Sequence, residues 1–415
     1  MVKMEIISKE SIKPSSKTPN HLTDHLRTYP LLMLDQFIPP SVYVPLILYY
    51  SLDESTSSVK QAEISSLLKR SLSYALSLYY PLAGRMKSES SVDSSDQGVD
   101  FFETQVDAQL SEILESPKVE VLTQFVPRAS EKSGGFLLGI QLNYFNCGGI
   151  AIGVSICHRI ADACTLSMFV KAWAATACGD TNMVAPSFIT SSIFPPKEQS
   201  GQPMSFESPR HWADTRRFCF SRSKIETLRD EIGASTVFQP TRVELVTAAI
   251  WKWAMNRKGR DQCRQLSAGH AVNIRGRMDP PLSECTFGNF IQGADAFGNR
   301  ELNLGELINK MREATGKIDQ EYLKELQGKN GYDMVVRYSK KLMEWSSDKE
   351  VDHIIFTSWC RFPFHEADFG WGKPIWVSTA SWAAPNFVVL MDSMSDVGGI
   401  EAWLTMAEDD ICDEM

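Results

Sequence analysis

His158 and Asp162 stand four residues apart, and their side chains are of the types that move protons. This spacing is about one helical turn, so both groups can lie on one side of a turn that leads into a helix. An imidazole with a reference pKa near ~6.5 is largely neutral at pH 7 and can act as a general base. Alternatively, His158 satisfies backbone groups and Asp162 is an acid in a first helical turn, favoured by the helix dipole. The pair alone leaves both interpretations open.

The residues on either side of this pair predict two rigid elements that would position it. Residues 149–157 carry no charge and are rich in β-branched residues, which is typical of a buried strand. Apolar residues recur at three- and four-residue spacing over 163–177, which predicts an amphipathic helix. His158 is therefore expected in a strand-to-helix turn, firmly held and partly desolvated. Its neighbour Cys157 is expected to point to the other face and to pack inward as a small apolar group.

A second candidate site lies at a predicted helix N-terminus in the second half of the chain. Pro240 and Thr241 precede an apolar pattern, and Glu244 follows Thr241 by three residues, which predicts a capping box. A helix N-terminus among cations suits a small ligand with phosphate groups, and a solvated charged face is an equal alternative. The basic residues of this region are Arg242, Lys252, Arg257, Lys258, Arg260, Arg264, Arg275 and Arg277.

The composition limits the class of protein. A chain of 415 residues with 43% hydrophobic and 10% aromatic residues is expected to form two domains of roughly 200 residues each. A net charge of −9 argues against nucleic acid or an anionic membrane as the main partner. Nine scattered cysteines without a C-x-x-C pair favour reduced thiols over zinc sites or disulfides. Without a signal pattern or a long apolar span, we expect a soluble cytoplasmic protein.

Periodicity outlines the remaining elements. We expect an α/β chain with an N-terminal domain over 1–178, a crossover linker over 179–210 and a C-terminal domain over 211–415. A long polar helix is predicted from Leu304 to Leu326, and Arg275 is expected in buried company at the end of a strand. Nucleophile-elbow, Walker A and dinucleotide-binding motifs are absent, as is a histidine pair with zinc-ligand spacing. Further strands are predicted at 42–50, 99–106, 136–145, 215–220, 375–379 and 386–392.

Two motifs together resemble a known family. His158-Arg-Ile-Ala-Asp162 in mid-chain and Asp368-Phe-Gly-Trp-Gly372 near the end resemble the BAHD family of plant coenzyme-A-dependent acyltransferases, most of all its alkaloid-type branch. The chain departs from the family pattern in a shorter segment after Arg300 and in ending at Met415, where relatives usually carry a further helix. Other similar stretches are Tyr80-Pro-Leu-Ala-Gly-Arg85, Cys147-Gly-Gly149, Asn273-Ile-Arg275, Gly288-Asn289 and Ser358-Trp-Cys-Arg361.

The resemblance implies a fold and a mechanism. The fold would be two chloramphenicol-acetyltransferase-like α/β domains, with mixed sheets, flanking helices and an active-site channel at their interface. His158 would be the general base, and Asp162 would orient its loop by pairing with Arg275. The indole N–H of Trp359, with Thr357 close by, would stabilise the oxyanion.

The resemblance also implies where the coenzyme binds. Thr241 and Arg242 at the capped helix are expected to contact the coenzyme, and we add Asn289 and Ser358 to this group. The motif that begins at Asp368 is expected to be structural, since two glycines suit a tight turn. Its members are Asp368, Gly370, Trp371 and Gly372.

The expected function is transfer of an acetyl group from acetyl-CoA to a hydroxyl of a bulky plant specialised metabolite, an alkaloid or terpenoid. The acetyl donor follows from the resemblance alone, and we expect a monomer. A malonyl or aromatic acyl donor, or an amine acceptor, is the alternative within the same chemistry. A catalytically inactive relative that binds a metabolite is the alternative outside enzymes. We expect no metal, no permanently bound cofactor, and neither nucleic-acid nor membrane partners.

Overall fold

The computed structural model describes residues 2–15, 28–52, 58–129, 135–180, 184–197, 213–233, 238–257, 265–347, 351–382 and 386–407. The chain divides into two compact units, each assembled from segments that are distant in the sequence. The division expected from the sequence, at 1–178, 179–210 and 211–415, stays a prediction. Unit 1 comprises Met1–Phe206, Ser283–Asn289 and Phe362–Ser381, and unit 2 comprises Glu207–Leu282, Phe290–Arg361 and Trp382–Met415.

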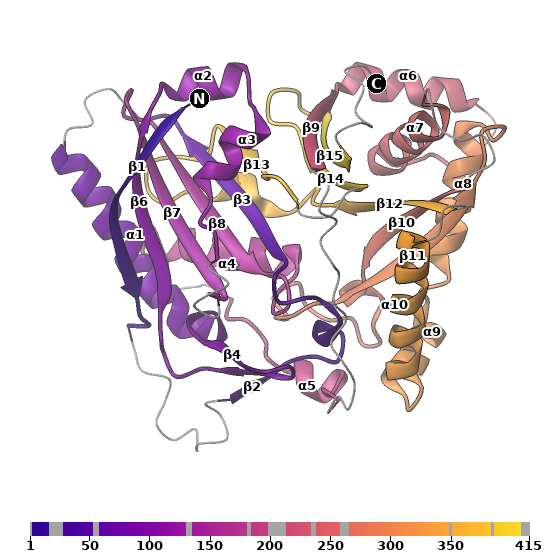
Figure 1. Cartoon of the computed structure of the whole chain (residues 1–415), viewed down its shortest axis with the longest axis horizontal. Coiled ribbons are helices and arrows are strands. Elements are labelled where there is room, and N and C mark those ends of the chain that lie inside the picture. Colours follow the sequence, from indigo (N-terminus) through magenta and orange to yellow (C-terminus); the bar gives the residue numbers. More distant parts are fainter. Residues whose placement is uncertain are drawn as a thin grey trace. The chain divides into compact units, whose positions relative to one another are not determined.

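Unit 1 is built on a six-stranded mixed sheet of order β1-β6-β7-β8-β3-β13 (Figure 1). β6 and β7 are parallel, and the other neighbours are antiparallel. The predicted strands of the first half are confirmed, whereas the sequence analysis did not predict β1 at the sheet edge. The strands are β1 (Lys3–Ile12), β3 (Tyr43–Tyr50), β6 (Val99–Asp107), β7 (Leu138–Phe145), β8 (Ile150–Cys157) and β13 (Trp376–Ser378), with a small sheet of β2 (Thr28–Pro30), β5 (Ser91–Asp93) and β4 (Arg85–Ser88).

Strand β8 is the element that carries His158, and all eight of its residues are buried. It runs between β7 and β3, so its backbone is paired on both sides. A Cβ at Gly153 would lie 1.9 Å from the carbonyl oxygen of Phe125, so only glycine allows this close approach. The uncharged sequence of this stretch therefore predicts the strand correctly, because a strand buried on both faces has no polar side.

Helices α1 (Ser58–Leu78) and α4 (Ala163–Ala177) pack against each other in unit 1. The indole N–H of Trp173 donates to Leu68 O at 3.2 Å and to Ser71 Oγ at 3.0 Å, which joins the two helices. The predicted bounds of α4 are confirmed. The shorter helices of the unit are α2 (Leu110–Glu115), α3 (Val119–Leu122) and α5 (Thr190–Ile193), with 3₁₀ turns that include η2 (Asp35–Phe37).

Unit 2 is built on a second six-stranded mixed sheet, of order β11-β10-β12-β14-β15-β9 (Figure 1). β10, β12 and β14 are parallel neighbours, and the outer pairs are antiparallel. The strands are β9 (Ala213–Phe220), β10 (Gln265–Asn273), β11 (Ile291–Gly298), β12 (Val351–Ser358), β14 (Phe387–Asp392) and β15 (Ile400–Ala407). The helices are α6 (Arg222–Ile232), α7 (Arg242–Asn256), α8 (Leu304–Gly316), α9 (Gln320–Gln327) and α10 (Gly331–Ser347).

One expectation about unit 2 was wrong, and another was confirmed in part. The single helix predicted from Leu304 to Leu326 is two helices, because the carboxylate of Asp319 accepts from the backbone N–H of Tyr322 at 2.9 Å and starts a new helix there. Arg275 is buried as expected, but the strand ends two residues earlier, at Asn273, and Arg275 begins a 3₁₀ turn (Arg275–Arg277). Among the described residues, no helix has the length and apolar character needed to cross a membrane.

Candidate active site

His158 is the first residue after strand β8, in a turn that leads to helix α4. Its backbone N–H donates to Val42 O at 2.8 Å, and the N–H of Ile160 closes the turn on Cys157 O at 3.1 Å. Its side chain is partly exposed, whereas Cys157, Ile160 and the strand before them are buried. The turn therefore presents one imidazole from an otherwise buried backbone that is hydrogen-bonded at Cys157, His158 and Ile160.

Asn289 contacts this imidazole although it lies 131 residues further along the chain. Its Oδ1 is 3.1 Å from Nδ1 of His158, and its Nδ2 donates to the backbone carbonyl of His158 at 2.8 Å. Asn289 is fully buried and belongs to the same unit. One amide thus fixes both the ring and the backbone of His158.

The pKa of His158 is lowered from its usual value of 6.5, with burial as the main cause. Hydrogen bonds to its own backbone and to Asn289 and the carboxylate of Asp162 act in the opposite direction and raise the pKa. Because the net shift is downward, the ring is neutral at pH 7. A neutral imidazole with one nitrogen unpaired by Asn289 is the form that a general base needs.

Asp162 is buried at the N-cap of helix α4. One of its carboxylate oxygens accepts from the backbone N–H of Thr165 at 2.8 Å. The hydroxyl of Thr165 in turn donates to Gly288 O at 3.0 Å, one residue before Asn289. Asp162 therefore fixes the start of the helix that follows the turn, and the His158 turn is anchored at both ends.

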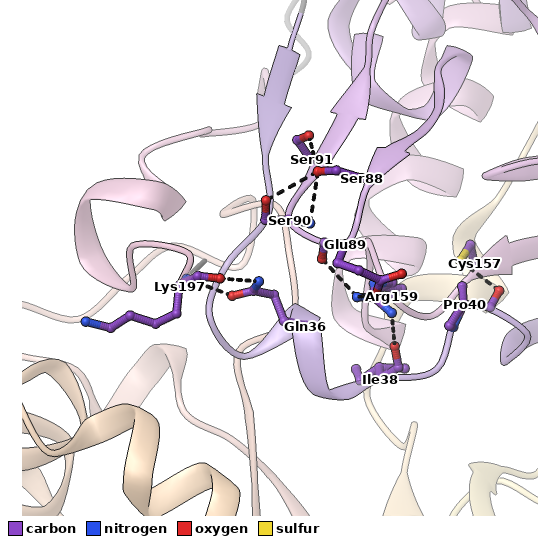
Figure 2. Close-up of polar contacts among 10 residues, drawn as sticks. All are labelled: Gln36, Ile38, Pro40, Ser88, Glu89, Ser90, Ser91, Cys157, Arg159 and Lys197. Atoms are coloured by element: carbon purple, nitrogen blue, oxygen red, sulfur yellow. Dashed lines mark hydrogen bonds and ion pairs between the residues drawn. The ribbon is translucent and has the colours of Figure 1, made fainter. Parts of the chain in front are cut away.

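Arg159, the next residue after His158, is 2% exposed and makes a second anchor (Figure 2). Its Nη1 donates to Ile38 O at 3.3 Å, and its Nη2 donates to Glu89 O at 2.8 Å. The same Nη2 pairs with the carboxylate of Glu89 at 2.5 Å. One guanidinium therefore ties the His158 turn to two loops of unit 1.

The loop that follows η2 runs beside this turn. Cys157 Sγ donates to Pro40 O at 3.6 Å, so Cys157 packs inward as predicted. Figure 2 shows the side chain of Gln36 between the backbone N–H and C=O of Lys197, at 2.9 and 2.8 Å. The contacts of Pro40 with Cys157 and of Val42 with His158 hold this loop against the turn, and Gln36 holds its start against Lys197. The hydroxyls of Ser88, Ser90 and Ser91 bond to one another beside Glu89 in the same view.

The predicted oxyanion residues lie in unit 2, at the end of β12. Thr357 and Ser358 are its last residues and pair with Val389 and Leu390 of β14. Trp359 is 3% exposed, and its backbone N–H donates to Leu390 O at 2.7 Å. Trp359 is the first residue after the strand, so Thr357 and Trp359 lie close together in the chain, and their shared oxyanion role stays a prediction.

The predicted coenzyme helix begins as expected. Thr241 is the N-cap of α7, and its capping box with Glu244 is confirmed. Glu244 also pairs with Arg312, and the hydrogen bonds from Arg312 and Thr241 outweigh burial, so that its pKa is lowered. Arg242 pairs with Asp392 at 2.9 Å. Of the basic residues predicted around this helix, Lys258, Arg260 and Arg264 lie outside the described residues.

Arg275 is 1% exposed in unit 2, with its guanidinium 4.9 Å from the ring centre of Phe290 and its Nη1 bonded to Asn273 at 3.3 Å. Asp162 belongs to unit 1, so the predicted pair of Asp162 with Arg275 stays a prediction. Among the described residues, no group of three or more histidine, cysteine or acidic side chains could hold a metal ion.

The Asp368–Gly372 loop closes on itself. One oxygen of Asp368 accepts from the backbone N–H groups of Gly370 and Gly372, at 2.8 and 2.9 Å. Both glycines have φ of 104°, which favours glycine over any other residue. Phe369 is buried against Trp173 of α4, with ring centres 4.9 Å apart. These contacts suit the structural role expected for Asp368, Gly370, Trp371 and Gly372.

Three residues of this region escaped the sequence analysis as site residues: Asp35, Glu89 and Arg159. Asp35 is fully buried and follows the apolar run Leu31–Leu34. A carboxylate or guanidinium in apolar company needs polar partners, and that signal was present at Asp35 and Arg159. Their partners could not be inferred, because they come from segments remote in the chain.

Comparisons with known proteins agree with this arrangement. A family model described as the Transferase family matches residues 2–412. Stemmadenine O-acetyltransferase from Catharanthus roseus is 38% identical over 98% of this chain and 95% of its own length. Limonoid 1-O-acetyltransferase from Citrus sinensis is 37% identical over 98% of this chain and 96% of its own length.

A crystal structure of vinorine synthase, an enzyme known from Rauvolfia serpentina, matches with a TM-score of 0.85 at 35% identity, over 98% of this chain and 96% of that one. The predicted fold class of two α/β domains with mixed sheets is thereby confirmed, and so is the resemblance carried by the two motifs. The chain belongs to the BAHD family of acyl-CoA-dependent O-acyltransferases.

Proposed function

We propose that the chain transfers an acetyl group from acetyl-CoA to a hydroxyl of a bulky specialised metabolite, an alkaloid or a terpenoid. The relatives named for stemmadenine and limonoid substrates support this acceptor class, and their names support the acetyl donor. The observation that carries the proposal is the His158 turn. It presents one partly exposed, neutral imidazole whose Nδ1 is already bonded to Asn289.

In the proposed reaction, Nε2 of His158 takes the proton of the acceptor hydroxyl while the oxygen attacks the thioester carbonyl. The tetrahedral intermediate collapses as its C–S bond breaks. The imidazolium then protonates the departing thiolate, so that an ester and free coenzyme A leave and His158 is neutral again. General base catalysis of this kind supplies ~10²–10⁴ in rate, and proximity of the two substrates supplies much of the remainder.

We further propose that the oxyanion of the intermediate accepts from the indole N–H of Trp359, with Thr357 beside it. A single donor of this type contributes ~3 kcal/mol in other oxyanion holes. This role requires a channel shared by the two units, which we propose as the path by which donor and acceptor reach His158 from opposite sides.

The remaining predicted roles stand as part of the proposal. Asp162 would pair with Arg275, since a buried arginine is stable only beside a carboxylate or equivalent acceptors. Thr241, Arg242 and Ser358 would contact the coenzyme, and the N-terminus of α7 would favour its phosphates. Arg242 would have to exchange its bond to Asp392 for a phosphate.

We also propose that the protein works as a monomer in the cytoplasm. The seven cysteines that the structure describes form no disulfide, as expected in a reducing compartment. Light scattering on the purified protein and a fluorescent fusion expressed in plant cells test these two points.

The experiment that tests the function is release of free thiol from acetyl-CoA with a panel of bulky alcohols and amines. Product mass measured with isotope-labelled acetyl-CoA identifies the acceptor. We expect thiol release that depends on an alcohol and is lost in His158→Ala. Release with amines alone would replace the O-acetyl assignment. Binding of panel compounds without any release would favour the inactive metabolite-binding relative.

A further inference from the structure

We propose that Asp35 and Asn289 are positioning residues that hold His158 in the tautomer with its proton on Nδ1, leaving Nε2 free as the base. This inference rests on the proposed role of His158 and deepens it. It also gives Asn289 a role other than the coenzyme contact expected from the sequence. The three side chains come from η2, from the segment before β11 and from the turn after β8, all within unit 1.

The three residues form one continuous buried chain. Oδ1 of Asp35 accepts from both the side-chain Nδ2 and the backbone N–H of Asn289, at 2.8 and 3.1 Å. Its other oxygen accepts from the backbone N–H of Leu32 at 2.7 Å. Asn289 then reaches His158 through both ends of its amide. Asp35 and Asn289 are both 0% exposed.

The orientation of the Asn289 amide follows from its partners. Its nitrogen lies 2.8 Å from a carboxylate oxygen of Asp35 and 2.8 Å from the carbonyl oxygen of His158. Both partners are acceptors, so this end must be the NH₂ group, and both of its protons are used. The opposite end must be the oxygen, 3.1 Å from Nδ1 of His158. An oxygen can only accept, so Nδ1 must carry the proton.

Asp35 holds the amide in that orientation. Its three N–H donors all favour the carboxylate, but burial is the larger influence and raises its pKa to about 7. The titratable groups near it are Asp162 at the N-cap of α4, which raises the pKa of Asp35 further, and Cys157 at the end of β8. An amide oxygen does not take up the Nδ1 proton at neutral pH. Asn289 and Asp35 therefore orient the ring without accepting its proton.

The chemical consequence is that His158 can accept a proton at Nε2 without first changing its tautomer. A histidine with its proton on Nε2 would present a donor to the acceptor hydroxyl and could not deprotonate it. When Nε2 takes a proton, the imidazolium is bonded to a neutral amide oxygen. The carboxylate of Asp35 bonds to the Asn289 amide and not to the ring itself. The arrangement therefore stabilises the cation less strongly than a directly bonded carboxylate would, and the thiolate can recover the proton.

The direct test is the nitrogen NMR spectrum of the histidine rings. The protein with ¹⁵N-labelled histidine is measured at pH 8, and the His158 signals are identified by their loss in His158→Gln. We expect a protonated Nδ1 and an unprotonated Nε2. Asn289→Ser removes the amide and should shift the ring toward the other tautomer. A proton on Nε2 in the unmodified protein, or no change in Asn289→Ser, would overturn the inference.

A kinetic test uses an exchange of the two side chains. Asn289→Asp loses the donors to Asp35 and to His158 O and places two carboxylates together, so kcat should fall ~10²-fold. In Asp35→Asn/Asn289→Asp the new amide can donate to the new carboxylate, and about tenfold of that loss should return. Rescue by the exchange is not expected if the two residues only fill space, and its absence in a folded double variant would contradict the inference.

Asn143→Asp is the matched control. Asn143 is 0% exposed in the same unit, and its Nδ2 donates to Phe125 O at 2.9 Å and to Ala151 O at 3.1 Å. This variant loses equivalent buried donors, and per folded molecule it should keep kcat and the His158 tautomer. A protein that shows the expected tautomer but releases no thiol would remove the proposed function alone. Thiol release with the wrong tautomer would remove only this inference.

Discussion

Each unit contains a histidine whose pKa is lowered by burial, and the two histidines differ in their accessibility and hydrogen bonding. His158 lies in a turn, partly exposed, with only its Nδ1 bonded to a side chain, that of Asn289. His353 lies within β12, and its side chain is 10% exposed. Its Nδ1 is 2.5 Å from Ser267 Oγ, and its Nε2 is 3.8 Å from Asp295, beyond hydrogen-bond distance.

By residue type, Ser267, His353 and Asp295 are the members of a hydrolase triad. Their surroundings exclude that chemistry, because Ser267 is 0% exposed and no substrate carbonyl can reach its hydroxyl. The ring also lies tilted against Trp345, at 4.8 Å between ring centres, and the Lys341 ammonium lies over the Trp345 ring. The difference teaches that a base requires an accessible nitrogen and a fixed tautomer, which residue types alone do not supply.

Removing each imidazole in turn is the most direct test of the difference between His158 and His353. His158→Ala should lower kcat by ~10³-fold with little loss of stability, because the ring is partly exposed and its turn is anchored through the backbone. His353→Gln is the matched control and should keep kcat. Thiol release and thermal unfolding are measured on both. Near-normal turnover in His158→Ala would remove the mechanism.

The next largest effect is expected at Asp162. Asp162→Ala loses the N-cap of α4, which costs ~1 kcal/mol, and frees the end of the turn, so kcat should fall ~10²-fold. Asp319→Ala removes an equivalent N-cap, that of α9 in unit 2. It should lose the ~1 kcal/mol of a cap, less than Asp162→Ala loses if Asp162 also pairs with Arg275, and it should keep kcat. Equal kcat values for the two variants would show that Asp162 is only a helix cap.

A smaller effect is expected at Arg159. Arg159→Lys keeps the charge but cannot hold Ile38 O and Glu89 O together, so the turn should loosen and kcat fall ~10-fold. Arg85→Lys is the control, since Nη1 of Arg85 also donates to two backbone carbonyls, those of Gly84 and Gly98, at 2.9 and 2.8 Å. If both variants turn over alike, the Arg159 anchor has no part in positioning His158.

The smallest effect on activity, and the clearest on stability, is expected from the pH response of His353. Burial and the Lys341 cation lower its pKa from 6.5 to about 4. The folded state therefore binds the His353 proton more weakly than the unfolded state does. The stability that the neutral ring contributes is complete above pH 6.5 and is lost as the pH falls toward 4. It amounts to at most ~3 kcal/mol.

His353→Gln should remove this component, so its unfolding free energy should fall less steeply between pH 6.5 and 4 than that of the unmodified protein. Denaturant unfolding at several pH values measures it. Parallel curves for the two proteins would show that His353 titrates normally.

Much of the candidate site could be predicted from the sequence because its signals are local. The uncharged run before His158 defines β8, the periodicity after Asp162 defines α4, and the Thr241–Glu244 spacing defines the start of α7. Each depends on residues within a few positions of one another. The predicted helix from Leu304 failed on the same scale, because the N-cap at Asp319 was read as helix interior.

The support of His158 could not be predicted, because it is built from long-range contacts. Asn289 is 131 residues from His158 and 254 residues from Asp35. Neither amide nor carboxylate shows a spacing that indicates its partner. The family motif singled out Asn289 as a coenzyme contact, which stays a prediction, while its contact with the histidine depends on the path of the chain through unit 1.

The path of the chain through unit 1 limits where this enzyme can be cut into fragments or joined to relatives. Ser283–Asn289 leaves the chain of unit 2 between β10 and β11 and belongs to unit 1, as does the later segment with β13. A fragment that stops at Phe206 would lack both the Asn289 amide that contacts His158 and an edge strand of its own sheet. Chimaeras with relatives must therefore exchange all three segments of unit 1 together, and co-expressed halves cut at a single point would each be incomplete.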